Sequence, residues 1–178
     1  ARHPKRFRAY ALTAHSKVDA LFKQCKKFEP VYAVMLDADA AETLRLKLQA
    51  MGSATEVLFG MAALEEVAAH PDVDVVMAAI VGAAGLKPAM AAAWSGKRIL
   101  LANKETLVMS GSLFMHAAKK GGATLLPIDS EHSAIFQVMP SQKYANLADG
   151  GVKRILLTAS GGPFRMASEA ELQAVTPQ

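Results

Sequence analysis

Short apolar runs alternate with longer segments of helical periodicity along the chain from Phe7 onward. This order is typical of repeated βα units around a parallel sheet. The pattern predicts strands at 8–12, 31–36, 55–58, 73–79, 98–102, 123–127 and 152–158. It predicts helices at 18–28, 40–51, 62–69, 85–95, 111–120, 133–139 and 168–174. The expected fold class is therefore α/β, with a doubly wound, mainly parallel sheet.

Two segments indicate where the core lies. The run 73–80 is almost continuously apolar after Asp74, which is expected of a strand covered on both faces and placed centrally in the sheet. In the helix at 18–28, one buried stripe is expected at positions i, i+3, i+4 and i+7, which are Val18, Leu21, Phe22 and Cys25. Cys25 is accordingly expected to be a core residue and not a nucleophile.

Composition excludes several classes of protein. The chain has 178 residues, of which 52% are hydrophobic and 20% charged, as in soluble α/β domains. Its apolar stretches are interrupted before the roughly 20 residues of a membrane span. One cysteine rules out an intramolecular disulfide, and the amino end does not look like a signal peptide, so we expect a cytoplasmic protein. The net charge of +4 comes from scattered Lys and Arg residues, which favours a small anionic ligand over nucleic acid.

Polar and small residues follow four predicted strands in a row. They are Ile80–Gly85, Asn103–Glu105, Ile128–His132 and Ala159–Pro163. Because ligands of open parallel sheets bind outside the carboxyl ends of the strands, these segments are expected to lie along one functional edge.

Asp129 and Glu131 are the candidate metal ligands at this edge. Two hard carboxylate oxygens, two positions apart, can point at one Mg²⁺ or Mn²⁺ ion. The alternative is that Asp129 or Ser130 caps the next helix and that Glu131 interacts with its positive first turn. Spacing alone leaves both interpretations open, and a third ligand would have to come from elsewhere.

Three further segments offer polar groups to a ligand. Lys104 can supply a cation to a substrate oxygen, or it can be a solvated lysine at a helix start, with Asn103 beside it. Ser160 and the glycines after it can form a phosphate-binding nest or a plain turn. After the first predicted strand, Ser16 and Lys17 suit a 2′-phosphate and hence NADP, unless Ser16 is merely the N-cap of a helix.

Four segments also occur in the order and at the separations of one known family. They read AAIVGAAGL at 78–86, LLANKE at 100–105, LLPIDSEHSAIFQ at 125–137 and LLTASGGPFR at 156–165. With them, the chain resembles the 1-deoxy-D-xylulose-5-phosphate reductoisomerases of the methylerythritol phosphate route to isoprenoids. The resemblance extends over essentially the whole chain.

The resemblance implies a fold and an activity. The fold is a Rossmann-like NADPH-binding domain, residues 1–127, that runs into the start of an α+β catalytic domain, residues 128–178. The activity is the rearrangement of 1-deoxy-D-xylulose 5-phosphate and its reduction by NADPH to 2-C-methyl-D-erythritol 4-phosphate. The family requires Mg²⁺ or Mn²⁺, with Co²⁺ as a further option, and its members are usually homodimers.

The resemblance also implies residue roles. Asp129 and Glu131 would bind the metal, and Lys104 and Glu131 would be catalytic. Lys104, Ser130, Glu131 and Ser160 would contact the sugar phosphate. Ser16, Lys17 and Asn103 would bind the cofactor, although His15-Ser16-Lys17 differs from the Gly-Lys-Asn of some members.

The glycine-rich GxGxxG loop of the family is not found in the chain and is expected upstream of Ala1, while the third metal ligand is expected after Gln178. Both ends are therefore interpreted as cuts, and the fragment alone is expected to be inactive. Two other hypotheses remain: a nucleotide-sensing module without chemistry, and another NADP oxidoreductase related to homoserine dehydrogenase.

Overall fold

The computed structural model describes residues 3–140, 147–158 and 162–176. Contacts between Cα atoms divide the chain into two compact units, Ala1–Asp129 and Ser130–Gln178. The division falls two residues after the predicted domain boundary.

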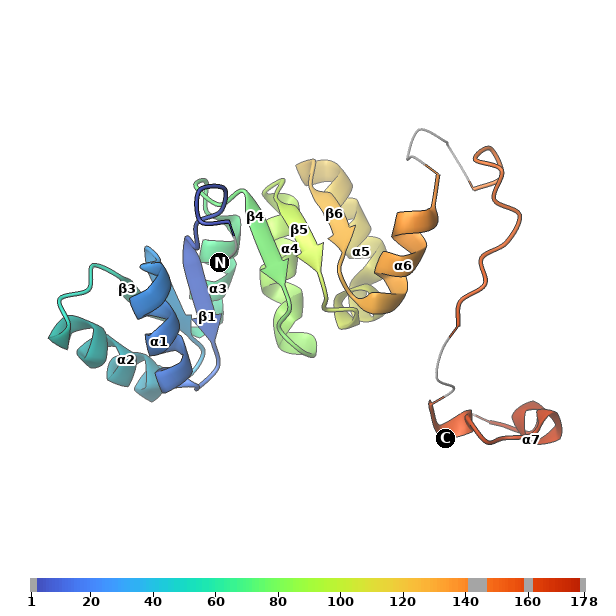
Figure 1. Cartoon of the computed structure of the whole chain (residues 1–178), viewed down its shortest axis with the longest axis horizontal. Helices are drawn as coiled ribbons and strands as arrows, with labels where there is room; N and C mark the ends of the chain where they lie inside the picture. Colours follow the sequence, from blue (N-terminus) through green and yellow to red (C-terminus); the bar gives the residue numbers. More distant parts are fainter. Residues whose placement is uncertain (1–2, 141–146, 159–161, 177–178) are drawn as a thin grey trace. The chain divides into compact units, whose positions relative to one another are not determined.

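Two three-stranded parallel sheets form the first unit (Figure 1). The first sheet has the order β1-β2-β3 and the second has the order β4-β5-β6. The strands are β1 Ala11–Ala14, β2 Tyr32–Met35, β3 Glu56–Phe59, β4 Val75–Ala78, β5 Arg98–Leu101 and β6 Thr124–Pro127. The helices of this unit are α1 Val18–Phe28, α2 Ala38–Ala50, α3 Gly60–Ala69, α4 Leu86–Trp94 and α5 Glu105–Gly121, with a 3₁₀ turn at Ala83–Gly85 before α4. The predicted α/β class is confirmed.

The first sheet is covered on both faces. Alternate residues of a strand point to opposite faces, so Ala33 and Met35 of β2 pack with α1 and α2, while Val34 packs against α3. The predicted stripe of α1 is confirmed, since Leu21 and Cys25 are buried in the same cluster as Met35.

The second sheet has one well-covered face. Ile99 and Leu101 of β5 are buried with Phe114 of α5 and with the alanines of α4. Residues Val75 and Met77 of β4 point the other way and are 39% and 58% exposed. Small alanine side chains in α4 let this helix pack closely against both α3 and α5.

Helix α3 connects the two sheets. Its Leu64 and Val67 pack under Val34 of the first sheet, and its Ala68 belongs to the core of the second. Just after α3, the Nε2 atom of His70 lies 3.3 Å from the hydroxyl of Tyr10, the residue before β1. The chain therefore runs outward from β1 to β3, crosses through α3, and runs outward again from β4 to β6.

Two expectations about strands are wrong. Among the described strands β4 is an edge strand and not a central one: it pairs only with β5, which is the middle strand, and its outward face stays exposed. No strand forms at 152–158 in the described part of the chain. Its apolar residues are exposed there, Leu156 by 77%, because a strand needs a neighbour that accepts its backbone hydrogen bonds and covers one face.

Helix α5 begins six residues earlier than predicted, at Glu105 instead of Gly111. Ser110 interrupts it with non-helical angles, φ −146° and ψ 30°, so the sequence pattern of the second half alone suggested a separate helix.

The second unit contains α6 Ser130–Val138, a 3₁₀ turn at Gly162–Phe164 and α7 Glu169–Gln173. A capping box opens α7, in which Ser168 and Glu171 exchange hydrogen bonds. In the residues that the structure describes, no helix is both long and apolar enough to cross a membrane.

Candidate functional site

Three parallel strands of the second sheet bring polar segments to one edge. β4, β5 and β6 are neighbours in register, so the residues after them, Ala79–Gly85, Asn103–Lys104 and Ile128–Asp129, follow the same ends of the sheet. Backbone hydrogen bonds tie these segments to the strand ends: Asn103 N–H donates to Ala78 O at 2.9 Å, and Ile128 N–H donates to Leu101 O at 3.0 Å. The prediction that these three segments lie along one edge of the sheet is confirmed.

The topology marks the position on the edge where a ligand is expected. In Figure 1, β3 lies to the left of β1, while β5 and β6 lie to the right of β4, so the direction of winding switches between β1 and β4. Ligands of open α/β sheets bind at such points, outside the carboxyl ends of the strands. The segments that begin there are His15–Lys17 after β1 and Ala79–Gly85 after β4.

Ser16 and Lys17 are exposed in the segment after β1. The interpretation of Ser16 as a helix cap is wrong, because α1 begins at Val18 and its N-cap is Lys17, which makes no side-chain cap hydrogen bond. The first turn of α1 is thus left without a side-chain cap, and uncapped backbone N–H groups favour anions.

Asn103 is a buried polar residue of the edge whose side chain is fully hydrogen-bonded. It is only 2% exposed, and its Nδ2 donates to the carbonyl oxygens of Ile80 and Gly82, the latter at 3.0 Å. Its Oδ1 accepts from the backbone N–H of Thr106 at 2.8 Å and from the Thr106 hydroxyl at 2.7 Å. Both amide protons and both lone pairs are therefore used within the protein.

Gly85 completes this arrangement. A Cβ atom at this position would lie 2.5 Å from Asn103 Nδ2 and 2.6 Å from Ile80 O, closer than real Cβ atoms approach. Gly82 is different: its φ is +75° and a Cβ would meet nothing within 4 Å. Gly85 thus gives room to the Asn103 side chain, and Gly82 leaves the loop surface open.

Lys104 stands at the N-cap position of α5 and is exposed, and it makes no side-chain cap hydrogen bond. The carboxamide of Asn103, one residue earlier, takes over the role of a cap by accepting from Thr106 N–H. Lys104 thus lies exposed at the start of α5, shortly after β5.

Asp129 is the last residue of the first unit, and Ser130 and Glu131 begin the second. Ser130 is the first residue of α6, and Glu131 lies in its first turn, where a carboxylate interacts favourably with the helix dipole. Among the residues that the structure describes, no group of three His, Cys, Asp or Glu side chains is arranged to hold a metal ion. Ser160 lies outside the described residues.

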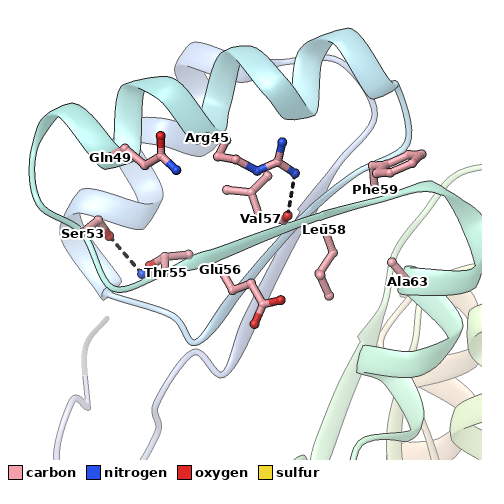
Figure 2. A pocket seen from close by; sticks show the side chains of 9 residues that line it. All are labelled: Arg45, Gln49, Ser53, Thr55, Glu56, Val57, Leu58, Phe59 and Ala63. Carbon is pink, nitrogen blue, oxygen red and sulfur yellow. Dashed lines mark hydrogen bonds between the residues drawn. The ribbon is translucent and has the colours of Figure 1, made fainter.

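A surface pocket of about 570 Å³ lies elsewhere, along β3 and the neighbouring part of α2 (Figure 2). Its lining includes Arg45, whose guanidinium donates to Val57 O at 3.1 Å, and Phe59. None of the predicted site residues lines it.

Comparison with known proteins covers both units. A family model described as 1-deoxy-D-xylulose 5-phosphate reductoisomerase matches residues 1–111, and one described as the C-terminal domain of that enzyme matches residues 125–178. The reductoisomerases of Methylobacillus flagellatus and Aromatoleum aromaticum are 70% and 61% identical to the chain, in each case over 99% of the chain and 44% of the relative.

Solved structures agree with the sequence comparison. A reductoisomerase crystallised with NADPH, fosmidomycin and magnesium aligns with a TM-score of 0.86 and 46% identity, over 98% of this chain and 44% of the other. The enzyme from Zymomonas mobilis in complex with NADPH aligns with a TM-score of 0.83 and 44% identity, over 99% of this chain and 44% of the other. The chain thus spans less than half the length of the relatives it matches, and it belongs to the 1-deoxy-D-xylulose 5-phosphate reductoisomerase family.

Proposed function

We propose that this chain supplies the NADPH-binding domain and the start of the catalytic domain of an enzyme that rearranges and reduces 1-deoxy-D-xylulose 5-phosphate. The product is 2-C-methyl-D-erythritol 4-phosphate, an intermediate of isoprenoid biosynthesis. The observation that carries the proposal is the edge at which Ala79–Gly85, Asn103–Lys104 and Asp129 follow three adjacent parallel strands. The chain by itself is expected to be inactive.

The residues at the switch point fit NADPH. Ser16 and Lys17 offer an exposed hydroxyl and a cation to the 2′-phosphate, beside the uncapped first turn of α1. The open surface at Gly82 lets the backbone approach the cofactor closely. Asn103 serves the nicotinamide side. When bound, NADPH supplies the hydride, and the protein determines its orientation.

The first domain of this proposal is residues 1–127. Among the described strands, β1 and β4 each have one unpaired edge. An additional parallel strand with a glycine-rich loop, belonging to the longer enzyme, would pair there and contribute to pyrophosphate binding.

Asp129 and Glu131 fit a divalent cation as two hard oxygen ligands, and Mg²⁺ or Mn²⁺ is the proposed ion. Because the described residues contain no group of three suitable ligands, a third carboxylate has to come from the rest of the enzyme. A bound divalent ion would act as a Lewis acid on the carbonyl and hydroxyl oxygens of the substrate.

The substrate is proposed to lie against Lys104, Ser130, Glu131 and Ser160. The Lys104 ammonium is exposed at the start of α5, where it can bond an oxygen on the reacting carbons. Ser130 bonds a further hydroxyl, and Ser160 binds the phosphate. Lys104 and Glu131 are the proposed catalytic residues, because they contact the atoms at which charge changes during the rearrangement.

The longer enzyme is proposed to be a cytoplasmic homodimer. Family membership and the single buried cysteine support this part of the proposal.

A chimera tests the proposed function. This chain replaces the matching 177 residues of the Methylobacillus flagellatus relative, and NADPH oxidation is followed with 1-deoxy-D-xylulose 5-phosphate and Mg²⁺. We expect turnover by the chimera and none by the 178-residue chain alone. A folded chimera that binds NADPH but does not turn over this sugar phosphate would refute the proposal.

A further inference from the structure

The side chain of Asn103 forms hydrogen bonds with the loop after β4. Ile80 and Gly82 lie in the segment Ala79–Gly85 that begins at the switch point, and their carbonyl oxygens both accept from Asn103 Nδ2. These two carbonyls therefore point toward the buried amide of Asn103. Val81, between them, is 85% exposed.

The same side chain also holds the start of α5. Oδ1 of Asn103 accepts two hydrogen bonds from Thr106, whose side chain is fully buried. The orientation of the amide is unambiguous, because only its nitrogen can donate to carbonyls and only its oxygen can accept from an N–H. The amide of Asn103 thus joins the loop after β4 to the first turn of α5.

We propose that Asn103 is a positioning residue for NADPH: its amide fixes the Ile80–Gly82 backbone at the cofactor edge through its bonds to these carbonyls and to Thr106. This inference rests on the proposed function. It assigns the effect of Asn103 on the cofactor to the loop, because all hydrogen-bonding groups of its side chain are already used within the protein.

Two neighbouring residues support this role of the Asn103 amide, whose hydrogen bonds to the loop and to Thr106 are called the clamp below. Gly85 leaves the space that the amide occupies, since a Cβ there would lie 2.5 Å from Nδ2. Lys104 follows Asn103 directly, so the clamp also fixes the backbone from which the proposed substrate-binding ammonium extends. A loop held in one position binds a ligand more tightly, because less conformational entropy is lost on binding.

Two variants of the chimera described above separate positioning from direct contact. Asn103→Asp keeps an acceptor for Thr106 but places a carboxylate oxygen against two carbonyl oxygens, which releases the loop. Thr106→Val keeps the shape of a fully buried side chain that cannot reach a ligand, and it removes only the hydroxyl donated to Asn103. Phe114→Leu in the core of the second sheet serves as a control for lost stability.

The dissociation constant of NADPH is measured by titration calorimetry at a temperature well below the unfolding midpoint of each variant, and the midpoints are measured separately. We expect NADPH to bind about tenfold more weakly to Asn103→Asp and about threefold more weakly to Thr106→Val, as the loss of one or two buried hydrogen bonds would give. The control is expected to unfold at a lower temperature and to bind NADPH within about twofold of the parent.

Three results would overturn the inference. Unchanged NADPH affinity in both variants would leave Asn103 with a structural role only. Weakened binding by Asn103→Asp, with unchanged binding by Thr106→Val, would point to direct contact between the amide and the cofactor. If the parent chimera folded without binding NADPH, the proposed function itself would fail, and the inference with it. Should Asn103→Asp not fold, the affinity of Thr106→Val decides the matter alone.

Discussion

The carboxamide oxygen of Asn103 accepts two hydrogen bonds from Thr106, one from its backbone N–H at 2.8 Å and one from its hydroxyl at 2.7 Å. This pair explains why a polar threonine can be fully buried at the start of α5. It also places the polar atoms of Asn103 away from solvent, although the residue lies at the edge where ligands are expected.

Replacing Gly85 with alanine is expected to destabilise the chain by about 1–3 kcal/mol, the usual cost of overpacking. The new Cβ would lie 2.5 Å from Asn103 Nδ2 and 2.6 Å from Ile80 O, and a shift of the amide would disrupt its hydrogen bonds to Ile80, Gly82 and Thr106. Urea unfolding followed by circular dichroism measures the change. Gly111→Ala is the matched control, because its Cβ meets nothing within 4 Å and alanine favours the helix. An equal loss in both variants would contradict the proposed clash.

Truncating Phe114 to alanine is expected to cost about 3–5 kcal/mol, since the fully buried ring fills the core under the second sheet. The adjacent Leu113 is 66% exposed on the same helix, so Leu113→Ala should change the free energy of unfolding by less than about 0.5 kcal/mol. Thermal unfolding of the two variants provides the measurement. Similar midpoints would show that α5 does not bury the face described here.

Removing the N-cap of α2 is expected to cost less stability than truncating Phe114. Asp37 precedes the helix in an extended conformation, and its Oδ1 accepts from Ala40 N–H at 2.7 Å. Asp37→Ala should destabilise the chain by about 1 kcal/mol, and Asp37→Asn should retain most of the stability because asparagine also caps helices. Chemical denaturation of the wild type and the two variants measures their free energies of unfolding. An alanine variant as stable as the wild type would contradict the cap.

Burial raises the pKa of the Cys25 thiol above its ordinary value of 9.0, because the thiolate would lose its hydration in the core under α1. The contribution of the buried neutral thiol to the free energy of unfolding is therefore fully present below the unfolded-state pKa. It is lost as the pH rises through the folded-state pKa. The difference in unfolding free energy between the wild type and Cys25→Ala should shrink as the pH is raised past 9.0. A difference that grew instead would show that the thiolate is stabilised.

A thiol reagent gives a second test of the same burial. Cys25 should react slowly in the folded chain and rapidly in urea, because only 1% of its surface is exposed. Fast reaction under native conditions would contradict the position assigned to this residue.

Sequence periodicity predicted most of the fold because each element of the first unit buries one face locally. The stripe of α1 and the alternating faces of β2 are such cases. The position of β4 in the sheet could not be predicted in this way, because an apolar run shows that a strand can be covered on both faces and not which strands pair with it. The strand predicted at 152–158 was wrong for the same reason, because strand pairing depends on residues distant in sequence.

The sequence predicted which residue types lie at the candidate site, but few of the contacts between them. Small and polar residues after strands located Asn103, Lys104 and Asp129 at one edge, as the parallel register requires. What the sequence did not reveal is that Asn103 bonds to Ile80 and Gly82, because these bonds join residues from two loops. The Asn-x-x-Thr spacing is the one local signal of the cap on α5.

The most direct test of the central claim is metal-dependent turnover by the chimera and by its Asp129→Asn variant. We expect the chimera to oxidise NADPH only when 1-deoxy-D-xylulose 5-phosphate and Mg²⁺ are both present. Asp129→Asn should lower the turnover by at least about a hundredfold while NADPH affinity stays within about twofold, because the variant removes a proposed metal ligand and leaves the proposed cofactor-binding residues unchanged. Unchanged turnover in Asp129→Asn, or NADPH oxidation that needs neither metal nor this sugar phosphate, would contradict the account.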